Sequence, residues 1–134
     1  MKILKERPPI YDAICRSIGK PPDTAIFAYG DTIYNPSGAE LSPDIIHHEK
    51  VHEKQQAGDP VDWWRKYLRD EDFRLDQELE AYAAQYKFIC NNSKDRNHRQ
   101  RMLHSFGKTL ASPMYGGIVD FGQAVNKIFK LSGV

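Results

Sequence analysis

The chain has 134 residues, a length at which one hydrophobic core is the rule, so we expect a single domain over residues 1–134. Apolar residues make up 40% and charged residues 28%, which excludes a disordered or fibrous chain. The formal charge of +1 and the scatter of Lys and Arg along the chain predict no nucleic-acid partner and no membrane partner.

Targeting and redox signals are also weak. No stretch approaches the length of a membrane span, and the charged N-terminus is followed by Pro8-Pro9 instead of the apolar core of a signal peptide. The two cysteines, Cys15 and Cys90, are too few for the disulfide framework of a small secreted protein and lack CxxC spacing. We therefore expect a soluble protein in the cytoplasm of the producing or host cell.

The first third of the chain predicts one helix and a β-hairpin. Apolar residues at helical spacing predict a helix over residues 10–18. The runs 25–29 and 32–34 are rich in β-forming residues and flank Gly30-Asp31, which suits a two-residue turn with glycine first.

The segment that follows carries a start and a stop signal for a second helix. Ser42 suits the N-cap, Pro43 suits the first helical position, and Gly58 suits the stop. We expect a helix from about Pro43 to Ala57.

The rest of the chain predicts further helices and no strands. A short aromatic helix should carry Trp63 and Trp64, which we expect to pack in the core; their side chains point about 100° apart, so both should not line one pocket. Periodic apolar residues predict helices over 72–90, 96–110 and 117–131. Together the patterns predict an α+β, mainly helical domain with a small β-hairpin or sheet beside the helix 43–57.

That helix contains the sequence HExxH. A spacing of four residues places His48 and His52 on one helix face, where both imidazoles can bind a single metal ion. Two such nitrogens and one carboxylate form a catalytic Zn²⁺ site that leaves one position for water. We predict His48 and His52 as zinc ligands and Glu49 as the general base that accepts a proton from the water.

The position of the third ligand separates the classes of HExxH peptidase. The metzincin class would require Gly and His where this chain has Gln55 and Gly58. A different likeness is carried by Tyr34-Asn35-Pro36, His48 to His52, Gln55-Gln56 and Glu78 to Tyr82. In these residues the chain resembles the gluzincins, which include thermolysin, and more closely the minimal single-domain metallopeptidases often encoded by bacteriophages and bacteria. The resemblance implies a Glu ligand from a second helix, in an ExxA pattern, and an edge strand beside the cleft that can pair with an extended peptide.

Two glutamates fit that pattern, Glu78 with Ala81 and Glu80 with Ala83. At 100° per residue, Glu78 projects about 80° from the centre of the apolar face and Glu80 about 120°. A carboxylate at the edge of an apolar face is well placed when it meets a cation. We therefore predict Glu78 as the third ligand, with Glu80 as the alternative.

The predicted activity is hydrolysis of an amide bond in a peptide or protein substrate. The residue that stabilises the oxyanion stays open among Tyr82, Tyr86, Tyr115, His98 and His104. The alternative function is a non-catalytic zincin-like structural or interaction module, such as a virion or regulatory protein. Its structural zinc would take a fourth protein ligand from among His47, Glu80, His98 and His104.

Overall fold

The computed structural model describes all 134 residues and has an α+β, mainly helical fold, as predicted. Its elements in chain order are β1 (Lys2–Leu4), α1 (Tyr11–Ser17), β2 (Phe27–Tyr29), β3 (Thr32–Tyr34), α2 (Pro43–Gln56), α3 (Pro60–Arg69), α4 (Glu71–Asn92), α5 (Arg96–Leu110), the 3₁₀ turn η1 (Pro113–Tyr115) and α6 (Phe121–Ser132). None of these helices has the length and apolar character needed to cross a bilayer.

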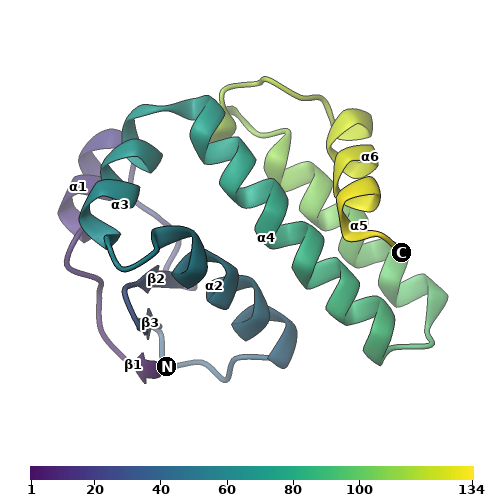
Figure 1. Cartoon of the computed structure of the whole chain (residues 1–134), viewed down its shortest axis with the longest axis horizontal. Coiled ribbons are helices and arrows are strands. Elements are labelled where there is room, and N and C mark those ends of the chain that lie inside the picture. Colours follow the sequence, from purple (N-terminus) through teal and green to yellow (C-terminus); the bar gives the residue numbers. More distant parts are fainter.

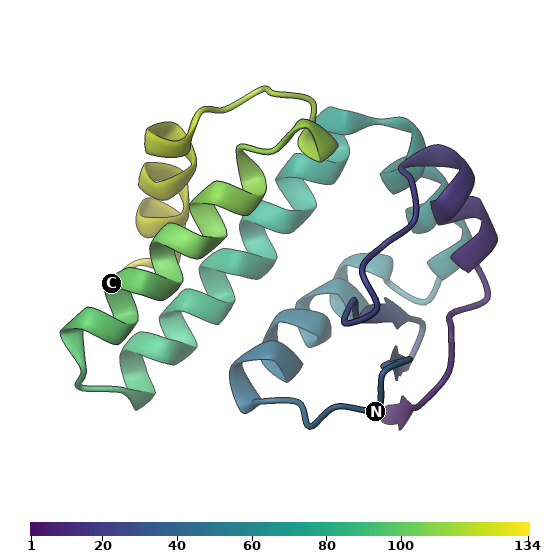
Figure 2. The same cartoon turned by 180° about the vertical axis from the view of Figure 1, so that it is seen from behind.

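Helix α4 runs between two groups of elements (Figures 1 and 2). On one side it packs against α5 and α6, around a core that includes Leu79, Phe106 and Ile128. On the other side it packs against α2, and a smaller core around Trp63 and Phe27 joins α1, β2 and α3. Because α2 also contacts β2, it lies between the sheet and α4.

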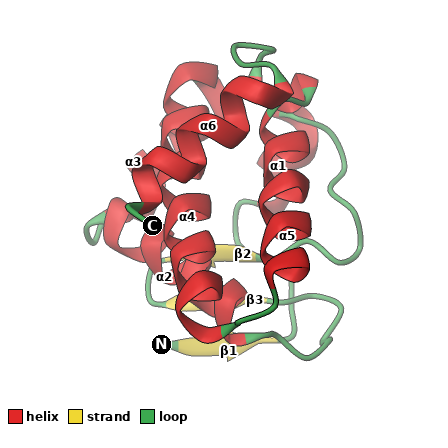
Figure 3. Ribbon diagram, turned by 90° about the vertical axis from the view of Figure 1, so that its right-hand side faces the viewer, coloured by secondary structure: helices red, strands yellow, loops and turns green.

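The three strands form one mixed sheet in the order β1-β3-β2, and Figure 3 shows them one above another. The predicted hairpin is confirmed: β2 and β3 are antiparallel, and Tyr29 pairs with Thr32 across the two-residue turn. Gly30 has a φ of 62°, a value that favours glycine, as expected for the first turn residue. Strand β1 was not predicted; it pairs in parallel with β3 through the backbone, while its three side chains are exposed.

The helix that carries HExxH begins and ends close to the predicted residues. It starts at Pro43, although the Ser42 side chain makes no capping hydrogen bond and only the extended backbone of Ser42 marks the start. At the other end Ala57 already takes a left-handed conformation with a φ of 50°, and Gly58 follows with 80°. The helix stop therefore uses two left-handed residues instead of the single glycine expected.

The last helix begins later than predicted. We expected it from Gly117, but α6 starts at Phe121 because Asp120 and Gln123 form a capping box there. Gly116 and Gly117 both have positive φ values, which lie outside a right-handed helix.

Candidate metal centre

Helix α2 buries three polar side chains, and two of them, His48 and His52, meet α4. His48, Glu49 and His52 are only 7%, 6% and 5% exposed. Burial of polar groups is unfavourable unless they are bonded, so each of these residues requires a partner. The partners of the two histidines come from α4 and from α2 itself.

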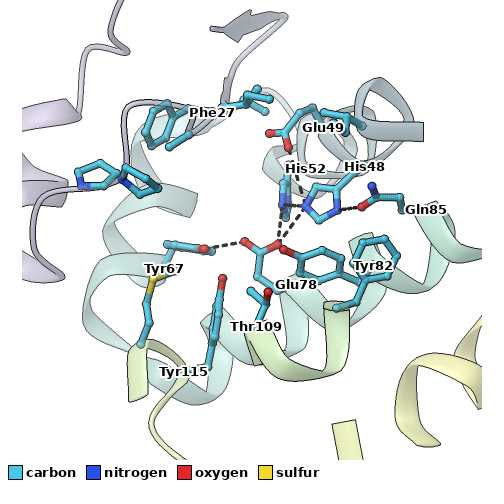
Figure 4. Close-up of a pocket in the computed structure, with 18 of the residues that line it drawn as sticks. Phe27, His48, Glu49, His52, Tyr67, Glu78, Tyr82, Gln85, Thr109 and Tyr115 are labelled. Carbon is cyan, nitrogen blue, oxygen red and sulfur yellow. Dashed lines mark hydrogen bonds and ion pairs between the residues drawn. The ribbon is translucent and has the colours of Figure 1, made fainter. Parts of the chain in front are cut away.

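Glu78 on α4 meets both histidines. Its Oε1 lies 3.1 Å from Nε2 of His48 and 3.1 Å from Nε2 of His52, and the two Nε2 atoms lie 3.2 Å apart (Figure 4). Glu78 is buried, whereas Glu80 is exposed and approaches only Gln55 of α2, at 3.4 Å. The structure thus brings together His48, His52 and Glu78 and leaves the alternative glutamate outside.

Two glutamines set the orientation of the imidazole rings. The Oε1 atom of Gln85 lies 2.9 Å from Nδ1 of His48, while its Nε2 donates to a carboxylate oxygen of Asp44 at 2.8 Å. Gln55 does the same for His52, with Oε1 at 2.8 Å from Nδ1 and Nε2 donating to a backbone carbonyl. Since an amide oxygen only accepts, both Nδ1 atoms donate, and in the neutral form of each ring the Nε2 atom has a lone pair directed at the point where the three side chains meet.

The spacing of the three atoms fits a tetrahedral metal ion. Zinc bonds to nitrogen and oxygen of about 2.0–2.2 Å imply distances of roughly 3.3–3.5 Å between ligand atoms. The three observed distances are 3.1, 3.1 and 3.2 Å. Two imidazole nitrogens and one carboxylate oxygen that converge in this way stabilise a shared cation, so the buried group could hold a metal ion.

The same geometry controls protonation. Burial lowers the pKa of His52, but the Glu78 carboxylate beside it outweighs burial and raises that pKa to about 9. For Glu78, burial raises the pKa, but the charge of His52 and hydrogen bonds from both histidines hold it well below its usual range. A proton on His52 and a metal ion therefore compete for the same position.

Glu49 lies next to this group without joining it. Its Oε2 is 3.8 Å from Nε2 of His48, and burial raises the pKa of its carboxyl group. Together with the histidines and Glu78 it borders a cavity of about 1130 Å³. Figure 4 shows Glu49 and Glu78 on opposite sides of the imidazoles. A carboxylate there can exchange a proton with a molecule held in the cavity.

The aromatic residues considered for the oxyanion occupy different places. Tyr82 packs its ring edge-on against His48 at 4.5 Å and borders the cavity. Tyr115 also borders the cavity and lies near the hydroxyl of Tyr67, whereas Tyr86 is in the core of α4, α5 and α6. The structure therefore leaves Tyr82 and Tyr115 beside the site and removes Tyr86 from it.

The remaining histidines do not join the metal group. His98 borders the cavity from α5, while His104 packs against Phe121 at 5.5 Å. His47 is exposed, and its ring lies 5.3 Å from that of Phe88.

The expectation that neighbouring tryptophans could not share a pocket is wrong. Trp63 and Trp64 both pack in the smaller core, as predicted, but both also border the cavity. The cavity extends around this end of α3 instead of meeting one face of it, so side chains 100° apart can both reach it.

Two residues that the sequence analysis missed as functional are Tyr67 and Gln85. Tyr67 donates a hydrogen bond of 2.6 Å to Oε2 of Glu78. Gln85 lies seven residues after Glu78, two turns along the same face of α4, and a polar residue at that buried position was the available signal. No signal in the sequence pointed to Tyr67.

Comparisons of the chain with models of known families, with curated proteins and with solved structures find no match.

Proposed function

We propose that this protein is a zinc-dependent peptidase of the gluzincin type, with His48, His52 and Glu78 as metal ligands and Glu49 as general base. The observation that carries the proposal is the convergence of three buried donor atoms within about 3 Å of one another, next to a separate carboxylate on the same cavity. Two histidines and one carboxylate are the ligand set of several catalytic zinc sites, and such a set leaves one coordination position open.

The chemistry divides between the metal and Glu49. Zinc bound at this group would act as a Lewis acid that polarises the amide carbonyl and acidifies water. Glu49 takes a proton from the water as the new carbon–oxygen bond forms, and returns it to the amine nitrogen as the carbon–nitrogen bond breaks. Burial favours the protonated form of Glu49, which helps the second of these transfers.

The cavity suits a short peptide segment with apolar side chains. Its volume of about 1130 Å³ is at the upper end of ligand pockets, and about half of its lining residues are hydrophobic. Side chains from α1, β2, α3, α5 and η1 form the walls, among them Ile14, Phe27, Trp64, Phe106 and Met114. Desolvation of apolar substrate side chains against these walls would supply most of the binding free energy.

The edge of the sheet supports an extended substrate. Strand β2 is an edge strand, and residues 25–28 border the cavity. The carbonyl of Ala28 already accepts hydrogen bonds from Gln56 at 2.7 Å and from Trp64 at 3.0 Å. The backbone N–H and C=O groups of successive residues in a strand point to opposite edges. Two residues before Ala28, the backbone groups of Ile26 therefore point to the same free edge of β2, and we expect the substrate backbone to pair with them.

The alternative, a non-catalytic module with a structural zinc, has less support. A closed structural site requires four protein ligands. None of the four residues that could supply the fourth ligand belongs to the metal group: His47, Glu80, His98 and His104.

A cytoplasmic location belongs to the proposal as well, supported by two cysteines that are both free thiols.

The experiment compares Glu49→Gln with Glu80→Gln as a matched control. The parent protein, loaded with zinc, is incubated with a peptide library, and new termini are identified by mass spectrometry. We expect Glu49→Gln to keep its zinc and its fold but to lose hydrolysis, because the amide keeps the size of the side chain and removes the base. Glu80→Gln should cleave like the parent. Equal cleavage by Glu49→Gln and the parent would refute the mechanism.

A further inference from the structure

The two oxygen atoms of the Glu78 carboxylate have different partners (Figure 4). Oε1 lies 3.1 Å from Nε2 of both His48 and His52. Oε2 instead accepts a hydrogen bond of 2.6 Å from the hydroxyl of Tyr67 on α3. Carboxylates bind metal ions through one oxygen or through both. Here one oxygen faces the metal group, and the other is engaged by the protein.

The Tyr67 side chain is held in place from several directions. It is 5% exposed, and its ring stacks on Trp63 with centroids 5.0 Å apart and meets the edge of Trp64 at 5.0 Å. The Arg74 guanidinium lies 5.6 Å from the ring centroid and donates to the backbone carbonyl of Tyr67 at 2.7 Å. Packing on these sides restricts the ring and sets the direction of its hydroxyl.

Among the three ligands, only Glu78 has a second donor atom that could reach the metal. Each imidazole offers one nitrogen, because Gln85 and Gln55 occupy the other nitrogen of His48 and His52. The glutamines therefore orient the rings but cannot change how many protein atoms bind the metal. The number of protein atoms on the metal depends on whether Oε2 of Glu78 keeps its hydrogen bond with the Tyr67 hydroxyl.

We propose that Tyr67 is a positioning residue that keeps Glu78 a one-oxygen ligand and thereby keeps the metal open to water and substrate. The inference rests on the metal site of the proposed function and concerns its coordination number. Without the hydroxyl, Oε2 would lose the hydrogen bond that the structure gives it, and a metal ion bound to Oε1 would be able to satisfy it. Tyr67 also borders the cavity, but the role proposed for it is exerted through the Glu78 carboxylate.

The test uses Tyr67→Phe, which removes the hydroxyl and keeps the stacked ring. The parent and the variant are loaded with Co²⁺, and stoichiometry, affinity and visible absorption are measured. Four-coordinate Co²⁺ absorbs several-fold more strongly in the visible range than Co²⁺ with more ligands. We expect the variant to bind one Co²⁺ per chain with an affinity within about 10-fold of the parent, and its visible absorption to fall several-fold. Its kcat should fall more than its KM changes.

Tyr86→Phe is the matched control, because Tyr86 is a buried tyrosine of α4 in the core away from the cavity. It should leave the spectrum of the Co²⁺ protein unchanged. An unchanged spectrum for Tyr67→Phe, or complete loss of Co²⁺ from a folded Tyr67→Phe protein, would overturn the proposal. A parent that binds no Co²⁺ would overturn both this proposal and the metal site. A parent that binds Co²⁺ but cleaves no peptide would refute the peptidase function alone, because the spectra would still decide the role of Tyr67.

A second measurement needs no variant, so it decides the matter even if Tyr67→Phe does not fold. In a crystal structure of the zinc-loaded parent, we expect Oε2 of Glu78 to remain on the Tyr67 hydroxyl and Oε1 alone to bind the metal. Both oxygens of Glu78 within bonding distance of zinc in the parent would overturn the proposal.

Discussion

The ion pair between His52 and Glu78 predicts how the stability of the metal-stripped protein changes with pH. The pKa of His52 in the folded protein is raised from 6.5 to about 9 by the buried carboxylate beside it. Below pH 6.5 the imidazole is charged in both the folded and the unfolded chain, so the ion pair contributes fully. As the pH rises through 9, the folded protein loses this proton, and the contribution disappears.

The size of the effect follows from the pKa change. At about 1.4 kcal/mol for each pKa unit, the change from 6.5 to about 9 corresponds to roughly 3 kcal/mol of unfolding free energy. That is a large part of the stability of an ordinary domain. The loss of the Glu49 proton adds to it in the same direction, because burial raises the pKa of that carboxyl group.

The assay is urea unfolding followed by tryptophan fluorescence, in the presence of a chelator, at steps between pH 6 and pH 9.5. The series stops there because burial raises the pKa of Tyr67 well above its usual value, so ionisation of tyrosine in the unfolded chain would add a second loss at higher pH. Glu78→Gln should abolish most of the dependence between pH 6.5 and 9, whereas Glu80→Gln should retain it. A free energy of unfolding that stays flat over this range in the parent would refute the assigned ion pair.

Three further predictions concern polar side chains of α2 and α4. In a competition titration against a chelator, Glu78→Ala should weaken zinc binding far more than Glu80→Ala. Glu80→Ala should lower zinc affinity by no more than about 10-fold, through the loss of its contact with Gln55. The reverse order would move the ligand assignment to Glu80. Gln85→Leu should lower zinc affinity about 10-fold to 100-fold, since His48 loses the acceptor on Nδ1, and parent-like affinity would show that this bond is dispensable. Gln56→Ala should lower the unfolding free energy by about 2 kcal/mol, because its amide bonds two backbone groups of the hairpin; a denaturant titration that matches the parent would contradict this.

The parts of the fold that local chemistry determines were predictable from the sequence. The helix from Pro43 was marked by its own start and stop residues, and the hairpin by its Gly30-Asp31 turn. Strand β1 could not be predicted, because it pairs with β3 from nearly 30 residues away and its exposed side chains carry no burial pattern. The start of α6 is set by the capping box of Asp120 and Gln123, a three-residue spacing that the sequence itself contains.

Only the part of the metal group that depends on the geometry of single helices was predictable from the sequence. The four-residue spacing of His48 and His52 and the facing of Glu78 are properties of single helices, and the structure brings all three residues together. The role of Tyr67 depends on how α3 sits against α4, which no periodicity within either helix specifies. For Gln85 the sequence shows a polar residue on the buried face of α4, but it does not show its partner, which lies on α2.

The central claim is that this chain holds one open zinc site. It is tested most directly by an anomalous-difference map at the zinc absorption edge, from crystals grown with zinc. We expect a single strong peak about 2.0–2.2 Å from Nε2 of His48, Nε2 of His52 and Oε1 of Glu78, with a non-protein ligand in the remaining position. A map with no peak among these three atoms, or a peak enclosed by four protein ligands, would contradict the claim.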